Sequence, residues 1–419
     1  MSATSSNSRA AVRNGPKPRI LILSAYYFPF QGGSETHART IATYLSRHGF
    51  PVVVVTKHHE DDSLAVETID GITVHRVPPR GPRTGLRKWA MIPFAFRKIL
   101  RLRDEFDVIY CPGYQGIGIA GILAGRWLRR PVVLRSGNLG VLMGDQWDAP
   151  LKRWHIPPEL ASVRWMKRRF TKFYMEADAF ACNCRDNENE ALAAHVPRED
   201  VYYLPNSVDV ERFRPAQPGE RARIRQEQGW PADAQLCFFV GRLSTEKGVL
   251  DLLTAWHDIG GANRILVLIG PDMPGPLNAG PAARSFVASM GMQDSVIFHG
   301  ASVETARLLR AADIYVQPSH YESFSNALIE AMATGLPAVA SRVGGMRDCI
   351  VDGENGLFAN PQDPMDLARK LRSLLDNPQL AARLGAKARE TMVSDFAEPL
   401  IMGRFAELFE NIWARRRSI

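Results

Sequence analysis

The chain contains 419 residues, 45% of them hydrophobic and 23% charged, and carries a formal net charge of +8. Its length exceeds the size at which a single hydrophobic core keeps growing, so we expect two domains of about 200 residues each. The composition is that of a folded globular protein and excludes disorder on a large scale.

The amino-terminal residues 1–18 contain no apolar run of signal-peptide length. We interpret them as a disordered leader and not as an export signal. Residues 109–125 form the most apolar long stretch, but Pro112, Gln115 and several glycines interrupt it, as in a buried strand, loop and helix and unlike a membrane span. The cysteines, odd in number, lie mostly in apolar runs without zinc-ligand spacing, which indicates reduced thiols in the cytoplasm and no metal site.

From residue 19 onward, short β-branched runs alternate with helical patterns, which predicts parallel sheets flanked by helices. The strands predicted in the first half are Arg19–Ser24, Val52–Thr56, Ile72–Val77, Val108–Cys111, Val132–Arg135, Ala179–Asn183 and Val201–Leu204. Pro205, Asn206, Pro215 and Pro218 then interrupt the pattern. We place a domain boundary there.

A second series predicts another doubly wound sheet, with strands Leu236–Val240, Ile265–Ile269, Val296–Phe298, Ile314–Gln317 and Ala338–Ala340. The chain ends in a long amphipathic segment, residues 397–416, which we expect to run back over the first domain. The expected organisation is a leader at 1–18, a Rossmann-like domain at 19–205, a second Rossmann-like domain at 206–395, and a returning helix at 396–419.

A glycine pair, Gly32 and Gly33, ends the loop after the first predicted strand, just before a helix that begins near Ser34. Glycine lets backbone N–H groups approach an anion at the positive end of a helix. The same pattern also fits a tight turn without a ligand.

Two cations follow the first strand of the second half. Arg242 comes directly after the strand, and Lys247 precedes Gly248 at the start of the next helix. At the carboxyl end of a sheet they would suit a diphosphate, because arginine offers a fork of donors and lysine a point charge. Two solvated basic side chains in a loop are the alternative.

Residues 318–335 read as a polar turn that opens an apolar helix. Free N–H groups near residues 324–326 would then receive a phosphate. Glu322 lies just before the helix and Glu330 on its second turn, and each carboxylate could accept hydrogen bonds from sugar or ribose hydroxyls. The alternative is a dipole partner plus an exposed helical glutamate.

Taken together, these motifs resemble the retaining GT-B glycosyltransferases of family GT4, the glycosyl transferases of group 1. The resemblance runs from about residue 19 to residue 410 and rests on five motifs in order. They are Gly32-Gly33, Pro205-Asn206-Ser207-Val208-Asp209, Gly241-Arg242 with Glu246-Lys247-Gly248, Glu322 to Glu330, and Val343-Gly344-Gly345. The resemblance implies a hexosyltransferase-type enzyme with two Rossmann-like domains facing a deep cleft, the first binding the acceptor and the second a nucleotide diphosphate sugar.

The resemblance also implies roles for individual residues. Arg242 and Lys247 would hold the diphosphate, the amides around Ser325 and Asn326 would support it, and Glu330 would bind the ribose. Glu322 would contact the transferred sugar, and Gly33 would let the first domain close on the donor. The full donor-binding set is Gly32, Gly33, Arg242, Lys247, Glu322, Phe324, Ser325, Asn326 and Glu330, of which Arg242, Lys247 and Glu322 would be catalytic. Same-face displacement is implied, with no metal and no cofactor besides the donor.

This chain departs from the family pattern near the expected reacting centre. Many relatives carry a histidine at the end of the strand that corresponds to Val132–Arg135, where this chain reads Arg135-Ser136-Gly137-Asn138. Either Arg135 or Asn138 fills part of that role, or the reaction proceeds without it. A nucleotide-sugar 2-epimerase and a non-catalytic nucleotide-sugar-binding subunit are the alternative functions.

The positive charge is concentrated in residues 80–103 and 152–172, which together carry +14, while the rest of the chain is net −6. Aromatic side chains lie among these cations, so we expect the first domain to dock on an anionic membrane surface and not on nucleic acid. The protein would then be cytoplasmic and peripheral at the membrane, and its acceptor would be lipid-linked, a polysaccharide or a small molecule. The alternative is that the aromatics belong to the cores of two amphipathic helices.

Overall fold

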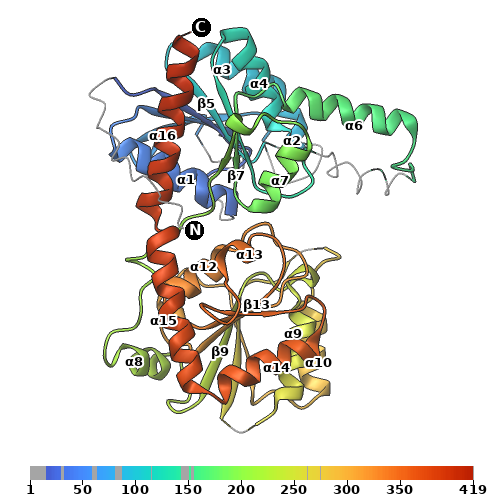
Figure 1. Ribbon diagram of the computed structural model, residues 1–419, viewed down its shortest axis with the longest axis vertical. Helices are drawn as coiled ribbons and strands as arrows, with labels where there is room; N and C mark the ends of the chain where they lie inside the picture. Colours follow the sequence, from blue (N-terminus) through green and yellow to red (C-terminus); the bar gives the residue numbers. More distant parts are fainter. Residues whose placement is uncertain are drawn as a thin grey trace, which may run out of the picture.

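The computed structural model describes residues 16–29, 33–58, 64–80, 87–114, 116–142, 151, 155–261, 263–273 and 275–418. The described chain forms two α/β domains, stacked one above the other in Figure 1, each built on its own sheet. The predicted fold class is therefore confirmed. Most of the proposed leader, residues 1–15, and Gly32 lie outside the described residues.

The first domain holds an eight-stranded sheet in the order β3-β4-β2-β1-β5-β6-β7-β8. All neighbouring strands pair in parallel except β3, which pairs antiparallel with β4 at the edge. The strands are β1 (Ile20–Leu23), β2 (Val52–Lys57), β3 (Val66–Ile69), β4 (Ile72–Val77), β5 (Val108–Pro112), β6 (Val132–Ser136), β7 (Ala179–Cys182) and β8 (Val201–Tyr203). Buried β-branched and aromatic residues fill the central strands, as expected of a sheet covered on both faces.

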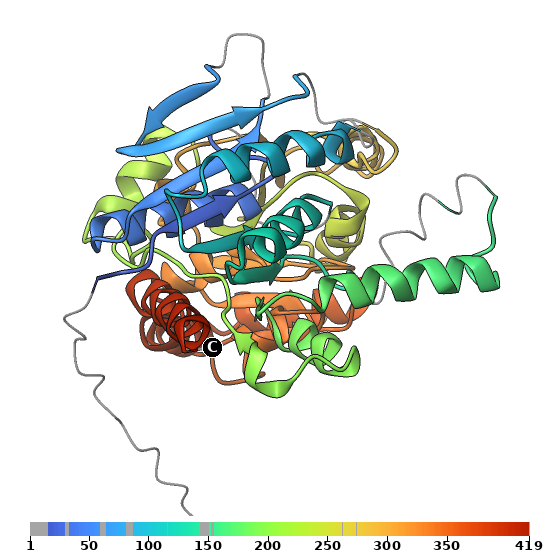
Figure 2. The ribbon, with the colours of Figure 1, turned by 90° about the horizontal axis from the view of Figure 1, so that it is seen from above.

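Helices cover the two faces of this sheet. The helices of this part of the chain are α1 (Gly33–Arg47), α2 (Arg87–Ala90), α3 (Ile92–Arg101), α4 (Ile117–Leu128), α6 (Ala161–Tyr174), α7 (Arg185–Ala193) and the 3₁₀ turn η2 (Arg198–Asp200). Helix α4 packs unusually close to the sheet, because a Cβ on Gly121 would lie 2.8 Å from Cys111 Sγ. Helix α6 extends away from the body of the domain, as Figure 2 shows.

The second domain holds a six-stranded parallel sheet in the order β11-β10-β9-β12-β13-β14. Its strands are β9 (Gln235–Val240), β10 (Arg264–Ile269), β11 (Val296–Gly300), β12 (Ile314–Gln317), β13 (Ala338–Ser341) and β14 (Leu357–Ala359). Its helical segments are α8 (Glu220–Glu227), η3 (Thr245–Lys247), α9 (Val249–Ile259), α10 (Gly280–Ser289), α11 (Thr305–Leu309), α12 (Asn326–Ala333), α13 (Met346–Cys349), α14 (Pro364–Leu375) and α15 (Pro378–Asp395). The twelve strands predicted from sequence are all present within two residues, and β3 and β14 were missed.

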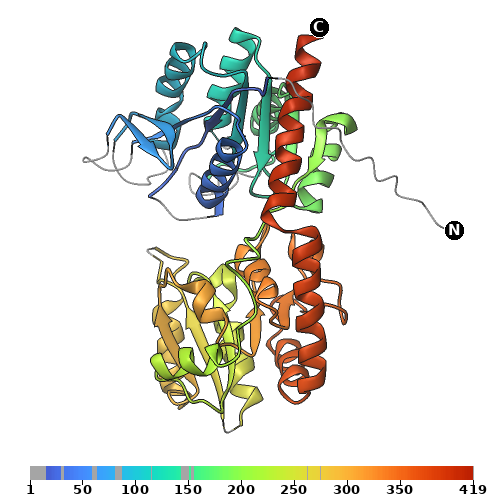
Figure 3. The ribbon, with the colours of Figure 1, turned by 90° about the vertical axis from the view of Figure 1, so that its left-hand side faces the viewer.

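The final helix, α16 (Glu398–Arg417), returns to the first domain, as Figures 1 and 3 show. The chain passes between the domains twice, and the two passages are bonded to each other. Val208 N–H donates to Phe396 O at 2.9 Å, and Glu398 N–H donates to Val208 O at 2.9 Å. None of the described helices combines the length and the apolar composition needed to cross a bilayer.

Helix α16 is held by aromatic packing against the first sheet. Phe405 is fully buried, and its ring centroid lies 5.2 Å from that of His37 and 5.7 Å from that of Tyr110. Because His37 belongs to α1 and Tyr110 to β5, one side chain joins three elements that are distant in sequence.

We therefore predict that Phe405→Ala lowers the free energy of unfolding by about 3–5 kcal/mol, since it leaves a cavity in a well-packed core. Chemical denaturation measures the loss. The neighbouring Arg404 is exposed, so Arg404→Ala is the matched control and should change stability little. Equal losses in the two variants would contradict docking of α16 through Phe405.

Candidate active site

The two domains meet through segments that follow the carboxyl ends of their strands. Leu139 N–H, after β6, donates to Tyr321 Oη, after β12, at 3.2 Å. Ser323 Oγ donates to Asn183 Oδ1 at 3.2 Å. In open parallel sheets this edge is where ligands bind, so the contact between the domains coincides with the expected binding edge of both sheets.

Helix α12 begins at this edge with free backbone donors. Ser325 caps the helix, because its Oγ accepts a hydrogen bond from Leu328 N–H at 3.2 Å. Among the described residues, the N–H groups of Asn326 and Ala327 have no acceptor, and both residues are partly exposed. The start of α12 is therefore equipped to receive an anion.

The loop that carries Glu322 is held from behind by the glycine pair of the Val343-Gly344-Gly345 motif. A Cβ on Gly344 would lie only 1.7 Å from Glu322 O, and Gly344 also has a positive φ of 48°. Gly345 N–H donates to Ser323 O at 2.7 Å. The Phe324 ring is buried in the core 6.0 Å from Phe396, so only its backbone faces the site, not the side chain.

Lys247 and Glu322, predicted separately as donor contacts, form an ion pair. Their side chains are 17% and 13% exposed, so both groups are largely shielded from water. The loops that carry them pack closely, because a Cβ on Gly248 would lie 2.0 Å from Pro318 O. Arg242 is exposed, and its guanidinium forms no ion pair within the described chain.

Glu330 lies one turn into α12 and is partly buried. Burial raises the pKa of its carboxyl to about 7, and the positive charge of Arg212 offsets only part of this effect. Its carboxylate has no hydrogen-bond donor among the described residues. Among the residues that the structure describes, no group of three or more His, Cys, Asp or Glu side chains is arranged to hold a metal ion.

Gly33, at the start of α1, faces α12 from the first domain. A Cβ built on Gly33 would lie 3.9 Å from Asn326 Nδ2. The structure therefore brings one of the two predicted glycines to the predicted phosphate-binding helix. The other, Gly32, lies outside the described residues.

Arg135 lies at the carboxyl end of β6 with only 3% of its surface exposed. It donates a hydrogen bond to Asn206 Oδ1, and Asn206 Nδ2 donates to Asn326 Oδ1 at 2.6 Å. Burial lowers the pKa of Arg135, which faces no carboxylate within the described residues. Arg135 thus connects to the predicted donor helix through Asn206.

Asn138 follows β6 and lines a different space. Together with Ser24, Tyr26, Glu35, Tyr114 and others it surrounds a cavity of about 150 Å³ in the first domain. The loop around it is fixed by Glu190, whose carboxylate accepts from Gly140 N–H at 2.8 Å and Leu142 N–H at 2.7 Å. Arg135 and Asn138, proposed as alternatives from sequence, therefore contact different groups.

Three residues of this site were not assigned contacts from sequence. Asn206 was identified only as part of the joint between domains, and Tyr321 only as part of the polar turn. Glu190 carries no local sequence signal, because its partners lie about fifty residues earlier in the chain.

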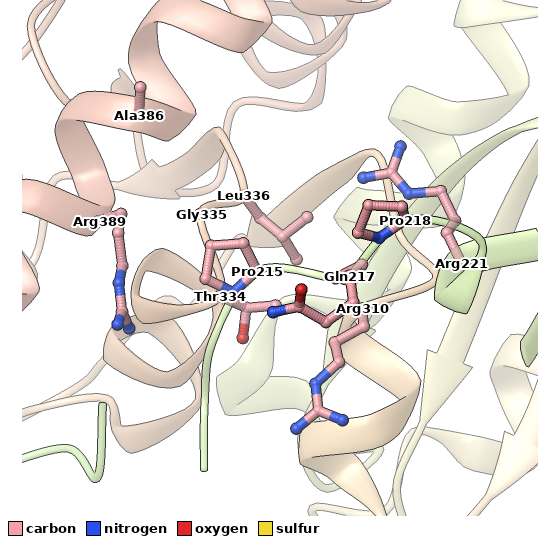
Figure 4. A pocket seen from close by; sticks show the side chains of 11 residues that line it. Pro215, Gln217, Pro218, Arg221, Arg310, Thr334, Gly335, Leu336, Ala386 and Arg389 are labelled. Carbon is pink, nitrogen blue, oxygen red and sulfur yellow. The ribbon is translucent and has the colours of Figure 1, made fainter. Parts of the chain in front are cut away.

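A larger cavity, of about 660 Å³, lies at the other end of α12, beside Thr334, Gly335 and Leu336. Figure 4 shows that the guanidinium groups of its three arginines point apart. Arg221 pairs with Asp313 and Arg310 with Glu220, whereas Arg389 donates to three backbone carbonyls. None of the motif residues lines this cavity, so it is not the predicted donor site.

Comparison with known families matches the chain in two parts. Residues 31–212 match the family model described as Glycosyltransferase Family 4, and residues 220–391 match Glycosyl transferases group 1. The D-inositol 3-phosphate glycosyltransferase of Kineococcus radiotolerans is 30% identical over 90% of this chain and 91% of its own length. The D-inositol 3-phosphate glycosyltransferase of Xylanimonas cellulosilytica is 28% identical over 89% of this chain and 92% of its own length.

Solved structures show the same fold. Sucrose-phosphate synthase from Thermosynechococcus elongatus superposes with a TM-score of 0.76 and 23% identity, covering 95% of this chain and all of its own. Anabaena HepE in complex with UDP superposes with a TM-score of 0.74 and 19% identity, covering 94% of this chain and 100% of its own. The matched families, the relatives and the GT-B architecture agree with the motifs around Lys247, Glu322 and Glu330, and the chain belongs to the group 1 glycosyltransferases of family 4.

Proposed function

We propose that this glycosyltransferase moves a sugar from a nucleotide diphosphate donor to an acceptor with retention of configuration and without a metal ion. The observation that carries the proposal is the Lys247–Glu322 ion pair at the loop that leads into α12, whose first N–H groups are free, with Gly33 of the first domain close to Asn326. In support, the structural neighbour HepE was solved with UDP and with UDP-glucose.

The second domain would bind the donor. Lys247, Arg242 and the N–H groups of Asn326 and Ala327 would surround the diphosphate, because all are positive or donate hydrogen bonds at one sheet edge. Glu330, farther along α12, would accept hydrogen bonds from the ribose hydroxyls. Glu322 would keep its contact with Lys247 while accepting from a sugar hydroxyl.

The implied reaction is a displacement on one face of the sugar. The bond between the anomeric carbon and the diphosphate oxygen breaks, and the acceptor oxygen bonds to the same carbon from the same side. The acceptor proton passes to the leaving phosphate oxygen. The main protein contribution would be stabilisation of the negative charge that develops on that oxygen, by Lys247, Arg242 and the start of α12.

The first domain would bind the acceptor in the 150 Å³ cavity beside Asn138. Polar groups of Ser24, Tyr26 and Glu35 contribute to its lining, which suits a hydroxyl-bearing end of a larger acceptor. A lipid-linked sugar, a polysaccharide end and a polyol all present such hydroxyls.

The first domain would also dock on an anionic membrane at the cytoplasmic face. Trp165 on α6 is 66% exposed, next to the exposed cations Arg164, Arg168 and Arg169. Helix α4, between α3 and α6, adds Trp127, which is 75% exposed and lies outside the two basic stretches. By contrast, Met91 just before α3 is buried and Ile92 and Phe96 pack on the core, so Phe94 is the large apolar side chain that α3 exposes. Trp154 lies outside the described residues.

Lys247→Ala should lower turnover by about 100-fold, because it removes a charge that interacts most strongly with the departing diphosphate. Radiolabelled sugar transfer from UDP-, GDP- and ADP-sugars to lipid and glycan extracts measures this. Lys370→Ala, on α14, is the control. Full activity of Lys247→Ala would show the site to be misplaced.

The purified wild-type chain should be active alone and equally active in EDTA, as measured by the same transfer assay. Activity that EDTA abolishes and magnesium restores would contradict metal independence.

The affinity for the nucleotide diphosphate should increase as pH rises through about 7, since the Glu330 carboxyl accepts ribose hydroxyls more strongly when ionised and its pKa is raised to about 7. Calorimetric titration between pH 6 and pH 8.5 measures this trend. In Glu330→Gln the affinity should be lower and should lose this part of the pH dependence, whereas the exposed Glu407→Gln should behave like wild type. Identical pH profiles for wild type and Glu330→Gln would remove Glu330 from the donor site.

Sedimentation with vesicles tests the membrane surface. The protein should bind anionic but not neutral vesicles, and binding should weaken as salt rises. Trp165→Ser and Arg168→Glu should each reduce it several-fold. Arg223→Glu makes the same charge change on α8 of the other domain and serves as the control. Failure to bind anionic vesicles at low salt would favour an acceptor that is free in solution.

A further inference from the structure

Arg135 is a buried cation without a counter-ion in the described structure. It is 3% exposed, it forms no ion pair there, and its Nε has no hydrogen-bond partner. A buried charge of this kind is strongly unfavourable unless another group compensates it. Among the described residues, its one side-chain hydrogen bond goes to Asn206, which is 9% exposed at the passage between the domains.

The hydrogen bond from Arg135 fixes the orientation of two amide groups. A guanidinium can only donate, so the atom of Asn206 that faces it must be Oδ1. Asn206 Nδ2 then points to Asn326 and donates to its Oδ1 at 2.6 Å. Each amide has an acceptor on one side and a donor on the other, so the direction set by Arg135 passes on to Asn326.

The chain of bonds ends on a free donor. With Oδ1 of Asn326 occupied by Asn206, its Nδ2 faces the first domain, 3.9 Å from the position of a Cβ on Gly33. Within the described residues this Nδ2 has no acceptor. Asn326 is the first residue of α12, so this side-chain donor and the free N–H groups of Asn326 and Ala327 belong to the same helix start.

We propose that Arg135 is a positioning residue that acts through Asn206 to present the Asn326 amide NH₂ to a phosphate oxygen of the donor. The proposal rests on the proposed function, because it assumes that a nucleotide diphosphate lies at the start of α12. The diphosphate would provide the negative charge that Arg135 lacks, and Arg135 would also strengthen the terminal donor by polarising the two amides.

The direction of the relay has a measurable consequence. If the Asn326 amide were reversed, its oxygen would face the phosphate, and repulsion would replace a charge-assisted hydrogen bond. Asn206→Asp forces this reversal, because a carboxylate accepts from both Arg135 and Asn326 and donates to neither. The same substitution gives Arg135 a counter-ion, so the folded state should not lose stability.

The test compares UDP binding and thermal stability in wild type, Asn206→Asp and Asn206→Ala, with GDP and ADP as further probes. For the nucleotide that wild type binds, Asn206→Asp should weaken affinity by about 10- to 100-fold, the effect of losing a charged hydrogen bond. Asn206→Ala should weaken it less, because Asn326 then remains free to turn its NH₂ outward. The melting temperature should be at or above the wild-type value in Asn206→Asp and lower in Asn206→Ala.

If Asn206 were only a structural bridge, affinity would follow stability, and Asn206→Ala would bind less tightly than Asn206→Asp. That order, or unchanged affinity in Asn206→Asp, would overturn the relay while leaving the proposed function intact. Failure of wild type to bind UDP, GDP or ADP would overturn both.

Arg135→Met keeps the volume of the side chain and removes its charge, so it should weaken affinity for the nucleotide about tenfold without lowering the melting temperature. If Asn206→Asp does not fold, the nucleotide affinity of Arg135→Met tests the relay in its place. Unchanged affinity in Arg135→Met would then overturn the relay.

Asn377→Asp is the matched control for the added negative charge. Asn377 caps α15 by accepting from Leu380 N–H at 3.0 Å, and aspartate caps a helix equally well. This variant should bind the nucleotide like wild type.

Discussion

The structure depends on one property of parallel sheets, which is that all their strands end at the same edge. In each domain the loops and helix N-termini that follow the strands gather at that edge, and the two domains bring these edges together. Residues as distant in sequence as Gly33, Asn206 and Asn326 thereby become neighbours. A polar site forms there without disturbing the apolar cores, because its groups lie at or beyond the carboxyl ends of the buried strands.

Much of this architecture was predictable from local patterns. Central strands are runs of buried β-branched residues, so their positions followed within two residues. The edge strand β3 was missed because its Val66–Ile69 segment is only partly buried and pairs in the opposite sense. Strand β14, Leu357–Ala359, was missed because it contains no β-branched residue. The returning helix was predicted from its apolar face, which packs on the first domain through Phe405.

The site itself was predictable only in part. The motifs identified loops that the structure brings to the joined edges, among them those of Lys247, Glu322 and Asn326, but not which side chains would meet. The Lys247–Glu322 pair spans 75 residues and the Asn206–Asn326 bond 120 residues, and no local pattern encodes such contacts. Likewise, residues 87–103 read as an alternation of cations and apolar residues, and only the packing of α3 shows that Met91 faces the core.

The hydrogen-bonded passages between the domains, Val208 with Phe396 and Glu398, have a mechanical consequence. The two connecting segments run side by side and form a hinge axis, because pulling them apart or sliding one past the other breaks both hydrogen bonds. The hydrogen-bonded pair therefore favours rotation of the domains about this axis over sliding. Such rotation displaces the parts of each domain that are far from the axis most and the connecting segments least. Asn206 lies two residues from Val208, so the polar relay sits close to the axis, where opening of the domains disturbs it least.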